Sequence, residues 1–176
     1  MKFVKLALVF GLVAFLPACN WFASKPEQSV KLRIVNVLDK EQFDDAHIKG
    51  SDTVASINVQ MADLESAASA WDKTVPVVVY CSNYFCTASG EAAKKLTELG
   101  FTDVWAYEAG MAEWYQLHKV DKTGQEYLIA GPAQQPYLEI VIPKPKKEHE
   151  DIRIISSQEL QKMIKEANIL DNGVNA

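Results

Sequence analysis

The 176-residue sequence predicts an α/β fold in which helices flank a parallel sheet, and three observations lead to this prediction. Short apolar, β-branched runs alternate with amphipathic segments, as is typical of parallel α/β sheets. One run, Val75 to Tyr80, is apolar throughout, which is expected of a strand buried on both faces. The 48% hydrophobic composition is sufficient for one domain with a sizeable core.

The first half of this pattern contains two strands and two helical segments. Leu32 to Val37 is apolar and β-branched, so we expect a strand there, and Lys40 to Ala46 is expected to form a short helical turn. Val54 to Val59 is the second expected strand. Asp63 to Trp71 is expected to be a helix, because its apolar residues recur at helical spacing.

The second half continues the alternation. After the strand Val75 to Tyr80, the amphipathic segment Glu91 to Leu99 predicts a helix, with Gly100 as its C-cap. Val104 to Tyr107 is the next expected strand, and Gly110 begins a short helix. Three tryptophans at the ends of elements are expected to belong to the core: Trp71, Trp105 and Trp114.

A C-terminal extension, residues 120 to 176, follows this region and carries no chemistry that can be recognised. Tyr137 to Ile142 and Ile152 to Ile155 are possible strands. Ser156 with Glu159 fits a capping box at the start of a helix. One face of that helix is apolar and consists of Leu160, Met163, Ile164 and Ala167.

The N-terminal residues 1 to 18 have the features of an export signal. A short basic start precedes the apolar run Leu6 to Leu16, and small residues follow. The apolar run is shorter than the roughly 20 residues that a membrane span requires. We therefore expect this segment to be a cleaved signal peptide.

Residues 16 to 19 resemble the lipobox of bacterial lipoproteins, although Pro17 is unusual in it. The resemblance implies that Cys19 becomes the lipid-modified, palmitate-bearing N-terminus of a lipoprotein, with residues 19 to 31 as a tether. Asn20 in place of Asp implies an outer-membrane location facing the periplasm. The alternative is an ordinary cleaved signal in which Cys19 has no role.

The charge of the chain argues against a nucleic-acid partner. Removal of residues 1 to 18 leaves 16 of the 18 basic residues against 23 acidic ones, a formal charge of −7. No basic face is evident, so we expect no nucleic-acid binding. No cofactor motif is evident, and no spacing of His, Cys, Asp and Glu predicts a metal site.

Residues 75 to 91 form the most informative segment. The apolar run ends on Cys81, a polar loop that contains Cys86 follows, and a helix is expected to start near Ser89. This order places Cys81 at the carboxyl end of a buried strand, facing the start of a helix. The N–H groups and the dipole of a first helical turn stabilise negative charge and so favour a thiolate. We therefore expect Cys81 to be an ionised, reactive thiol.

From Val35 to Trp114 the chain resembles a rhodanese-like domain. Glu41-Gln42-Phe43 followed by His47-Ile48-Lys49-Gly50 is similar to a conserved segment of that family. The matching pieces also occur in the family's order. Val77 to Cys81 matches the strand that leads into the cysteine, and Val104 to Trp114 matches a later segment. The helix between them is matched at Ser89, Ala92, Ala93, Leu96 and Gly100-Phe101.

The resemblance implies a sulfurtransferase. Its cysteine accepts a sulfane sulfur from a donor such as thiosulfate and passes it to a nucleophilic acceptor, which is covalent catalysis through a persulfide. The expected partners are a small sulfur-containing anion or a thiol acceptor. The resemblance also assigns an anion-binding loop to the residues after Cys81: Ser82, Asn83, Tyr84, Phe85, Thr87, Ala88 and Ser89.

The chain departs from the family's pattern at two places. The first strand ends in Asn36-Val37-Leu38, where the family usually has Asp-x-Arg. The loop from Ser82 to Ala88 contains no Arg or Lys and is about two residues longer than usual, so thiosulfate is expected to bind more weakly. Cys86 lies within this loop and is expected to act as a resolving or second thiol.

Several alternatives remain open at this stage. Cys81 could be a buried small hydrophobe. Cys81 and Cys86 could form a structural disulfide, because an exported protein meets an oxidising compartment. Tyr84 and Phe85 line a pocket mouth, dock a protein partner or simply pack. The rival to an enzyme is a catalytically silent rhodanese fold that binds a partner.

Overall fold

The computed structural model describes residues 30–119, 128–144 and 151–172. The expectations for the signal peptide, Cys19 and most of the tether fall outside these residues. Within the described residues, no helix is long and apolar enough to cross a membrane.

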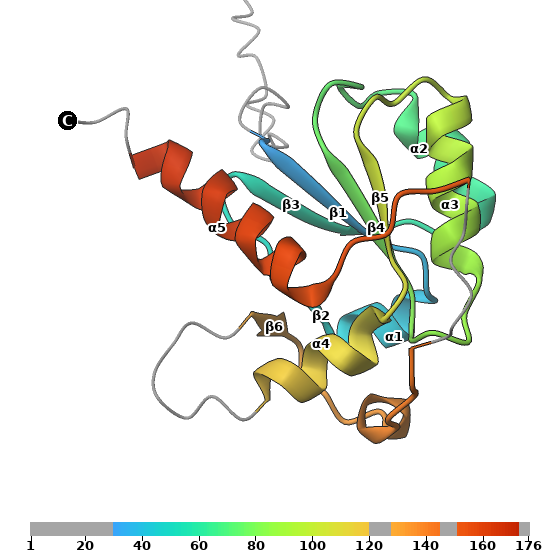
Figure 1. Cartoon of the computed structure of the whole chain (residues 1–176), viewed down its shortest axis with the longest axis vertical. Coiled ribbons are helices and arrows are strands. Elements are labelled where there is room, and N and C mark those ends of the chain that lie inside the picture. The colour runs from blue at the N-terminus through green and yellow to red at the C-terminus, as the bar shows by residue number, and fades with distance from the viewer. Residues whose placement is uncertain (1–29, 120–127, 145–150, 173–176) are drawn as a thin grey trace, which may run out of the picture.

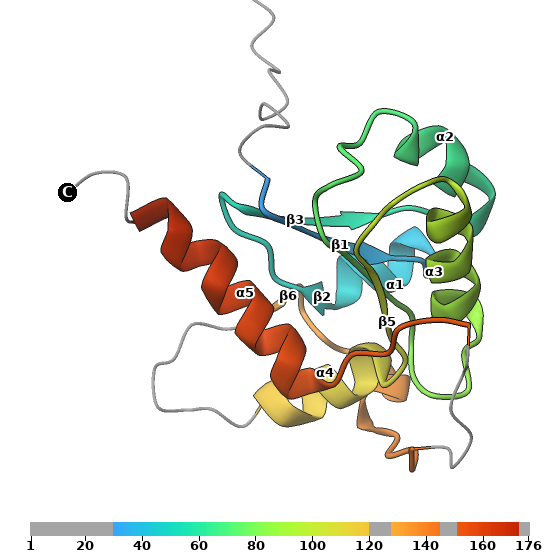
Figure 2. The ribbon, with the colours of Figure 1, turned by 45° about the horizontal axis from the view of Figure 1, so that its top comes forward.

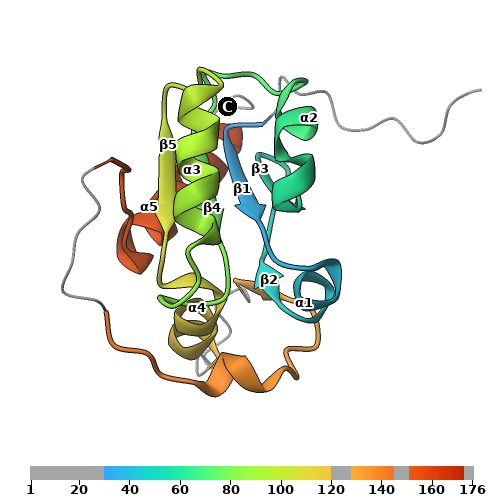
Figure 3. The ribbon, with the colours of Figure 1, turned by 90° about the vertical axis from the view of Figure 1, so that its right-hand side faces the viewer.

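A four-stranded parallel sheet forms the centre of the fold. Its strands are β1 (Leu32–Asn36), β3 (Val54–Asn58), β4 (Val77–Tyr80) and β5 (Val104–Tyr107), in the order β3-β1-β4-β5. All four were expected from the sequence, and their parallel pairing confirms the predicted α/β class. The C-terminal ends of the strands lie along one edge of the sheet (Figure 3).

Helices cover both faces of the sheet. On one side lie α2 (Leu64–Ala68) and α3 (Ala88–Glu98), and on the other lies α5 (Ser157–Asn172), as Figure 3 shows. Side chains alternate between the faces along β4. Val77, Val79 and Cys81 pack in the cluster under α2 and α3, whereas Val78 and Tyr80 pack in the opposite cluster. Cys81 therefore belongs to the α3 side.

The remaining elements lie near the carboxyl edge. The helix α1 (Lys40–Asp45) leads into β2 (His47–Ile48), which pairs with β6 (Ile129–Ala130) in a small antiparallel sheet. Fully buried Trp114 belongs to α4 (Gly110–His118) and packs edge-on against Tyr107.

Two predicted helices differ from the structure in length. Before α2 the chain forms a 3-10 turn (Met61–Asp63), and α2 ends at Ala68, so Trp71 lies beyond it. The helix α3 begins at Ala88, three residues before the predicted start, and Gly100 caps its end with a φ of +89°.

The predicted strand Tyr137 to Ile142 is wrong. Residues Pro136–Glu139 form a 3-10 helix, η3, with the proline at its start. The side chain of Gln116 on α4 donates hydrogen bonds to the carbonyl oxygens of Leu138 (2.9 Å) and Ile140 (3.2 Å). These carbonyls are therefore bound by a helix and do not join a strand ladder. We call residues 131–144 the strap; they run past α4 on the carboxyl side of the sheet (Figures 1 and 3).

The predicted strand Ile152 to Ile155 is reduced to one parallel bridge between Ile154 and Ala106 of β5. The capping box is confirmed: Ser156 N–H donates to the Glu159 carboxylate (2.9 Å), and Glu159 N–H donates to Ser156 Oγ (3.3 Å). The predicted apolar face of α5 is buried at three residues and half-buried at Met163. It places α5 across β1 and β3 (Figure 2).

Candidate functional site

Cys81 directly follows β4, and residues 82–87 form the loop that leads into α3. The loop therefore lies at the carboxyl edge of the sheet, where α/β proteins place their binding sites. We call residues 81–88 the cysteine loop.

The first turn of α4 fixes the orientation of the peptides in the cysteine loop. Met111 N–H donates to the carbonyl of Cys81 and Ala112 N–H to the carbonyl of Ser82, both at 2.9 Å. In a trans peptide the N–H points opposite to the C=O. Since α4 holds these two carbonyls, the N–H groups of Ser82 and Asn83 point away from α4 and into the loop.

Only glycine fits at residue 110, where α4 begins. Gly110 has a φ of +66°, a conformation that other residues rarely adopt. A Cβ atom on Gly110 would also lie 2.6 Å from Cys81 O and from Asn83 N. The close approach of α4 to the cysteine loop therefore depends on this glycine.

The cysteine loop closes on itself through Asn83. Cys86 N–H donates to the carbonyl of Asn83 (3.0 Å), and Phe85 N–H donates to Asn83 Oδ1 (3.0 Å). This turn brings Cys86 back against Asn83. It also leaves Phe85 at the tip, where 81% of its surface is exposed.

Cys81 is fully buried, and its sulfur contacts two carbonyl oxygens and Ser89. Cys81 Sγ lies 3.2 Å from the carbonyl oxygen of Cys86, 3.9 Å from that of Asn83 and 3.6 Å from Ser89 Oγ. Carbonyl oxygens can accept the S–H proton but cannot stabilise a thiolate. The hydrogen bond to Cys86 and the burial of the group raise the pKa of Cys81 above its ordinary value, although hydrogen bonds from the side chain and the backbone of Ser89 act against them.

Cys86 has the opposite environment. Its side chain is half-buried, and the Cys81 thiol hydrogen-bonds to it, as do the backbone N–H groups of Ala88 and Ser82. These donors, with the Cys81 bond the largest, lower the pKa of Cys86 to about 6, although burial acts against them. The half-buried Cys86 is therefore the thiol of the pair whose pKa is lowered.

A hydrogen bond between the two thiols raises the pKa of Cys81 and lowers that of Cys86, and the expected Cys81 thiolate stays a prediction. The peptide orientation set by α4 directs the Ser82 N–H at Cys86, whereas the N–H and the hydroxyl of Ser89 lie at Cys81. Both cysteines are free thiols in the structure. Cys81 and Cys86, which are five residues apart in the sequence, do lie in contact.

The other predicted loop residues have separate positions. Ser89 is buried with its hydroxyl at Cys81, and Thr87 is exposed and donates to Glu91 (2.9 Å). Tyr84 is half-buried and donates to Glu113 Oε2 on α4 (3.3 Å). Phe85 is exposed and so is not packed in the core. Tyr84 has a polar partner, Glu113, which the sequence did not predict.

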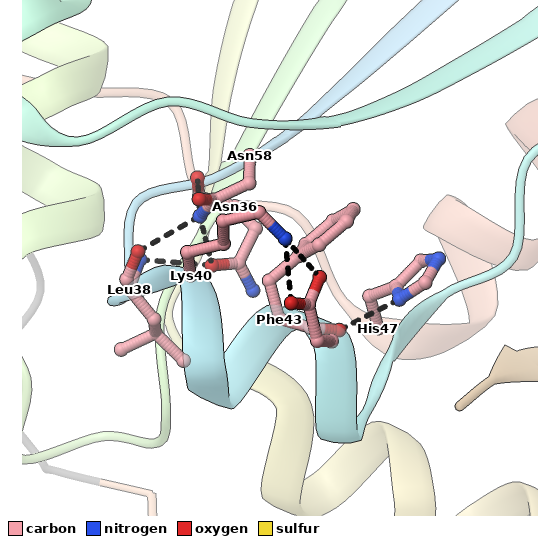
Figure 4. Close-up of polar contacts among 7 residues, drawn as sticks. Asn36, Leu38, Lys40, Phe43, His47 and Asn58 are labelled. Atoms are coloured by element: carbon pink, nitrogen blue, oxygen red, sulfur yellow. Dashed lines mark hydrogen bonds and ion pairs between the residues drawn. The ribbon is translucent and has the colours of Figure 1, made fainter. Parts of the chain in front are cut away.

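Uncharged side chains form a hydrogen-bond network at the end of β1, where the chain has Asn36-Val37-Leu38 in place of the family's Asp-x-Arg (Figure 4). Asn36 Oδ1 accepts from the N–H of Leu38 (2.8 Å) and from Asn58 Nδ2 (3.3 Å). Asn58 Nδ2 also donates to the carbonyl of Leu38 (2.8 Å). Two amides thus hold this turn next to the cysteine loop without adding charge.

The contacts of His47 are local and involve Phe43 of α1. Its Nδ1 is 2.8 Å from the carbonyl of Phe43, and its ring stacks on the Phe43 ring with centroids 4.0 Å apart (Figure 4). Among the described residues, no group of three His, Cys, Asp or Glu side chains is arranged to hold a metal ion.

Sequence reasoning missed two residues of the site, Gly110 and Glu113. Gly110 was expected only to begin a helix, although a glycine three residues after a predicted strand can mark a close backbone approach. No sequence signal marked Glu113, because its three donors come from distant segments: Tyr84, Tyr107 and Ser157.

Fold and site together define a class of protein: a parallel α/β domain that presents a cysteine pair in a loop of backbone amides at the carboxyl edge of the sheet. The family described as "Rhodanese-like domain" matches residues 20–117, more than half of the chain. The chain therefore belongs to the rhodanese-like family, as the sequence pattern predicted.

Relatives that are named thiosulfate sulfurtransferase support a sulfurtransferase-type function at the level of the family. The chain is 32% identical over 106 residues to the thiosulfate sulfurtransferase GlpE of Pseudomonas aeruginosa, covering 57% of this chain and 90% of that protein. It is 31% identical over 85 residues to GlpE of Coxiella burnetii, covering 48% and 73%.

Solved structures that resemble the chain include a rhodanese with anions from E. coli (30% identity, TM-score 0.37, covering 45% of this chain and 86% of that one). A protein from Bacillus halodurans aligns at 22% identity with a TM-score of 0.46, covering 58% and 66%.

Proposed function

We propose that this domain transfers sulfane sulfur through a cysteine persulfide on the Cys81–Cys86 pair, with Cys86 as the first nucleophile. The observation that supports this most is the environment of Cys86. It is half-buried, it receives hydrogen bonds from the Cys81 thiol, from the Ala88 and Ser82 N–H groups and from the Ser82 hydroxyl, and its pKa is lowered to about 6. A thiolate that is both populated at neutral pH and accessible is what a nucleophilic cysteine requires.

The first step forms one S–S bond and breaks another. The Cys86 thiolate attacks the terminal sulfur of a donor R–S–S⁻ or of thiosulfate, and the thiolate R–S⁻ or sulfite leaves with the electron pair of the broken bond. Cys86 becomes a persulfide. The N–H groups of Ser82 and Ala88, which hold the thiolate, are placed to stabilise the anionic persulfide in the same way.

Two second steps are compatible with the pair. An external thiolate can take the outer sulfur, which returns Cys86 as a thiolate. Alternatively Cys81, after giving up its proton, attacks Cys86 Sγ, which forms a Cys81–Cys86 disulfide and releases the outer sulfur as sulfide. The second route requires an external dithiol to reduce the disulfide.

The relatives are named for thiosulfate, but the cysteine loop of this chain contains no cation to hold a dianion. The loop relies on backbone N–H groups alone, so we propose that thiosulfate is a weak donor here.

A silent partner-binding module is the second candidate. The exposure of Phe85 at the tip of the cysteine loop favours it, because an apolar side chain with 81% of its surface exposed suits a protein contact. The lack of a basic residue in the loop also favours it.

We also propose that the protein is a lipoprotein, anchored through Cys19 to the periplasmic face of the outer membrane after removal of residues 1–18. The support is the sequence pattern of the N-terminus. Expression in a Gram-negative host tests it: membrane fractions should contain an acylated N-terminal peptide, and Cys19→Ser should abolish it. An unmodified, freely soluble wild-type protein would refute this proposal.

Sulfane transfer to cyanide or to a small thiol tests the proposed function. The full chain with Cys19→Ser serves as the parent, because it lacks the third thiol and keeps the pair. Cys86→Ser should abolish transfer, and Cys81→Ser should retain loading of Cys86 but lose sulfide release by the disulfide route. An inactive parent with a folded domain would support the silent module.

A further inference from the structure

The exposed apolar side chains of the domain gather on one side of it. In the described part of the chain, the large apolar residues that are exposed are Phe85, Leu117, Ile140, Val141 and Ile169. Ile169 lies toward the C-terminal end of α5, which runs away from α4 (Figures 1 and 2). The other four belong to the cysteine loop, α4 and the strap, which meet on the carboxyl side of the sheet. A group of this kind marks an interaction site, whereas single exposed apolar residues do not.

A small cavity lies among these four residues. It is bounded by the cysteine loop, α4 and the strap, and its volume is about 60 Å³. Ile140 and Val141 line it from the strap, and Tyr84, the neighbour of Phe85, lines it from the cysteine loop. A single buried water needs roughly 10–15 Å³, so the cavity has room for the end of one inserted side chain. The surface therefore consists of an exposed apolar rim around a small hollow.

Hydrogen bonds of Gln116 give this rim a fixed shape. The side-chain amide of Gln116 donates to the carbonyl oxygens of Leu138 (2.9 Å) and Ile140 (3.2 Å), so the strap is tied to α4. The next residue of α4, Leu117, is one of the four exposed apolar residues. A preformed surface loses little conformational entropy when it binds. The rim is therefore suited to a protein contact.

The hollow contains a carboxylate and no cation. Glu113 lines the cavity and accepts hydrogen bonds from the hydroxyls of Tyr84, Tyr107 and Ser157. These donors are neutral, so they leave the negative charge of the carboxylate uncompensated. None of the residues that line the cavity, all of them in the described chain, is Lys, Arg or His. A carboxylate inside an apolar rim is complementary to a Lys or Arg side chain with apolar neighbours.

The same charge argues against two other occupants. A second copy of the chain would bring a second Glu113 to the same symmetric interface, and the formal net charge of −5 on each chain adds repulsion. An anionic lipid surface would also be repelled by the carboxylate.

We propose that this surface, made of Phe85, Leu117, Ile140 and Val141 around the Glu113 cavity, docks a protein that presents a Lys or Arg between apolar side chains. The cation enters the cavity against Glu113, and its apolar neighbours cover the rim. Because Phe85 is the tip of the cysteine loop, the docked protein lies beside that loop. The inference concerns binding alone and does not depend on the proposed sulfur transfer.

Random twelve-residue peptides displayed on phage test the chemistry of the partner. The folded Cys19→Ser chain is the target, and the double variant Phe85→Ser/Val141→Ser in the same background removes peptides that bind elsewhere. The selected peptides should contain a Lys or Arg with apolar residues on both sides. Selected peptides that lack a basic residue would overturn the inference, and so would the absence of any peptide that distinguishes the target from the double variant.

The affinity of the most enriched peptide is then measured by fluorescence anisotropy. Val141→Ser should weaken binding by about tenfold. Ile169→Ser is the matched control, because Ile169 is an apolar residue of similar exposure on another element (65% against 78% for Val141), and it should leave the affinity unchanged. Equal losses in the two variants would contradict the proposed location.

A double-mutant cycle tests the contact with Glu113. Glu113→Gln should weaken binding, and so should replacement of the basic residue of the peptide by Gln. Both changes together should weaken it no further than either alone, whereas additive losses would show that the cation does not meet Glu113. If Glu113→Gln does not fold, salt decides: added salt should weaken binding of the basic peptide and not of its Gln form.

Sedimentation and vesicle binding test the other occupants. The Cys19→Ser chain should be a monomer and should show no binding to phosphatidylglycerol vesicles that Val141→Ser removes. A dimer, or vesicle binding, that Val141→Ser abolishes would overturn the inference in favour of a second copy or a lipid surface. Cys81→Ser/Cys86→Ser should bind the peptide as the parent does, so a failure of sulfur transfer and a failure of docking are measured separately.

Discussion

Replacement of Cys81 by Ala should raise the pKa of Cys86, because the Cys81 thiol is the largest of the groups that lower it. With a pKa of about 6, about nine-tenths of Cys86 is thiolate at pH 7. Complete loss of the shift would return the pKa to about 8.5 and the thiolate fraction to about 3%. The N–H groups of Ser82 and Ala88 remain, so we expect a midpoint between these limits.

The rate at a single pH would hide this change. If the shift were lost completely, the thiolate fraction at pH 7 would fall about thirtyfold. The intrinsic nucleophilicity of a thiolate, however, rises with its pKa, by about tenfold for such a shift. The net loss at pH 7 would then be only about threefold. The change is therefore measured from two features of the plot of alkylation rate against pH, namely its midpoint and its plateau above pH 9.

The assay is alkylation of the Cys19→Ser chain by iodoacetamide across pH 4 to 10, followed at Cys86 by peptide mass spectrometry. The parent should alkylate with a midpoint near pH 6, its rate falling as pH drops through that value. Cys81→Ala should move the midpoint up and raise the plateau. Cys81→Ser keeps a donor and should stay closer to the parent, which separates hydrogen bonding from packing. A parent midpoint near 8.5, or an unchanged midpoint in Cys81→Ala, would refute the reasoning.

Three further predictions concern the loop and its supports. Gly110→Ala should lower the free energy of unfolding by about 2 kcal/mol or more, because a positive φ costs about 1–2 kcal/mol and the new Cβ overlaps backbone; equal denaturant midpoints for variant and parent would contradict it. Ser156→Ala should cost about 1 kcal/mol through loss of the capping box, measured in the same way, with exposed Ser66→Ala as the control. Phe85→Arg should lower the KM for thiosulfate, most clearly at low salt, by adding a cation beside Cys86; a KM that does not change would count against the role given to charge.

The sequence predicted the sheet well because its signal is local. Val77 to Tyr80 is apolar on both faces, and that alone identifies a central parallel strand. The position of Cys81 at its carboxyl end follows from counting residues. Both features depend on side chains that are neighbours in the chain.

The ionisation of the pair could not be predicted in this way. It depends on the direction of two peptide planes, which Met111 and Ala112 fix from a helix about 30 residues later. The helix dipole argument considers Cys81 alone and contains nothing about its hydrogen bond to Cys86. The strap was mispredicted for a similar reason, since Gln116 binds carbonyls that an apolar run alone assigns to a strand.

The location of the first persulfide tests the central claim most directly. The Cys19→Ser chain is mixed with less than one equivalent of a persulfide donor, quenched within one turnover and fragmented by tandem mass spectrometry between Cys81 and Cys86. We predict that the added sulfur atom is on Cys86. A first persulfide on Cys81, with Cys86 still a thiol, would contradict the account.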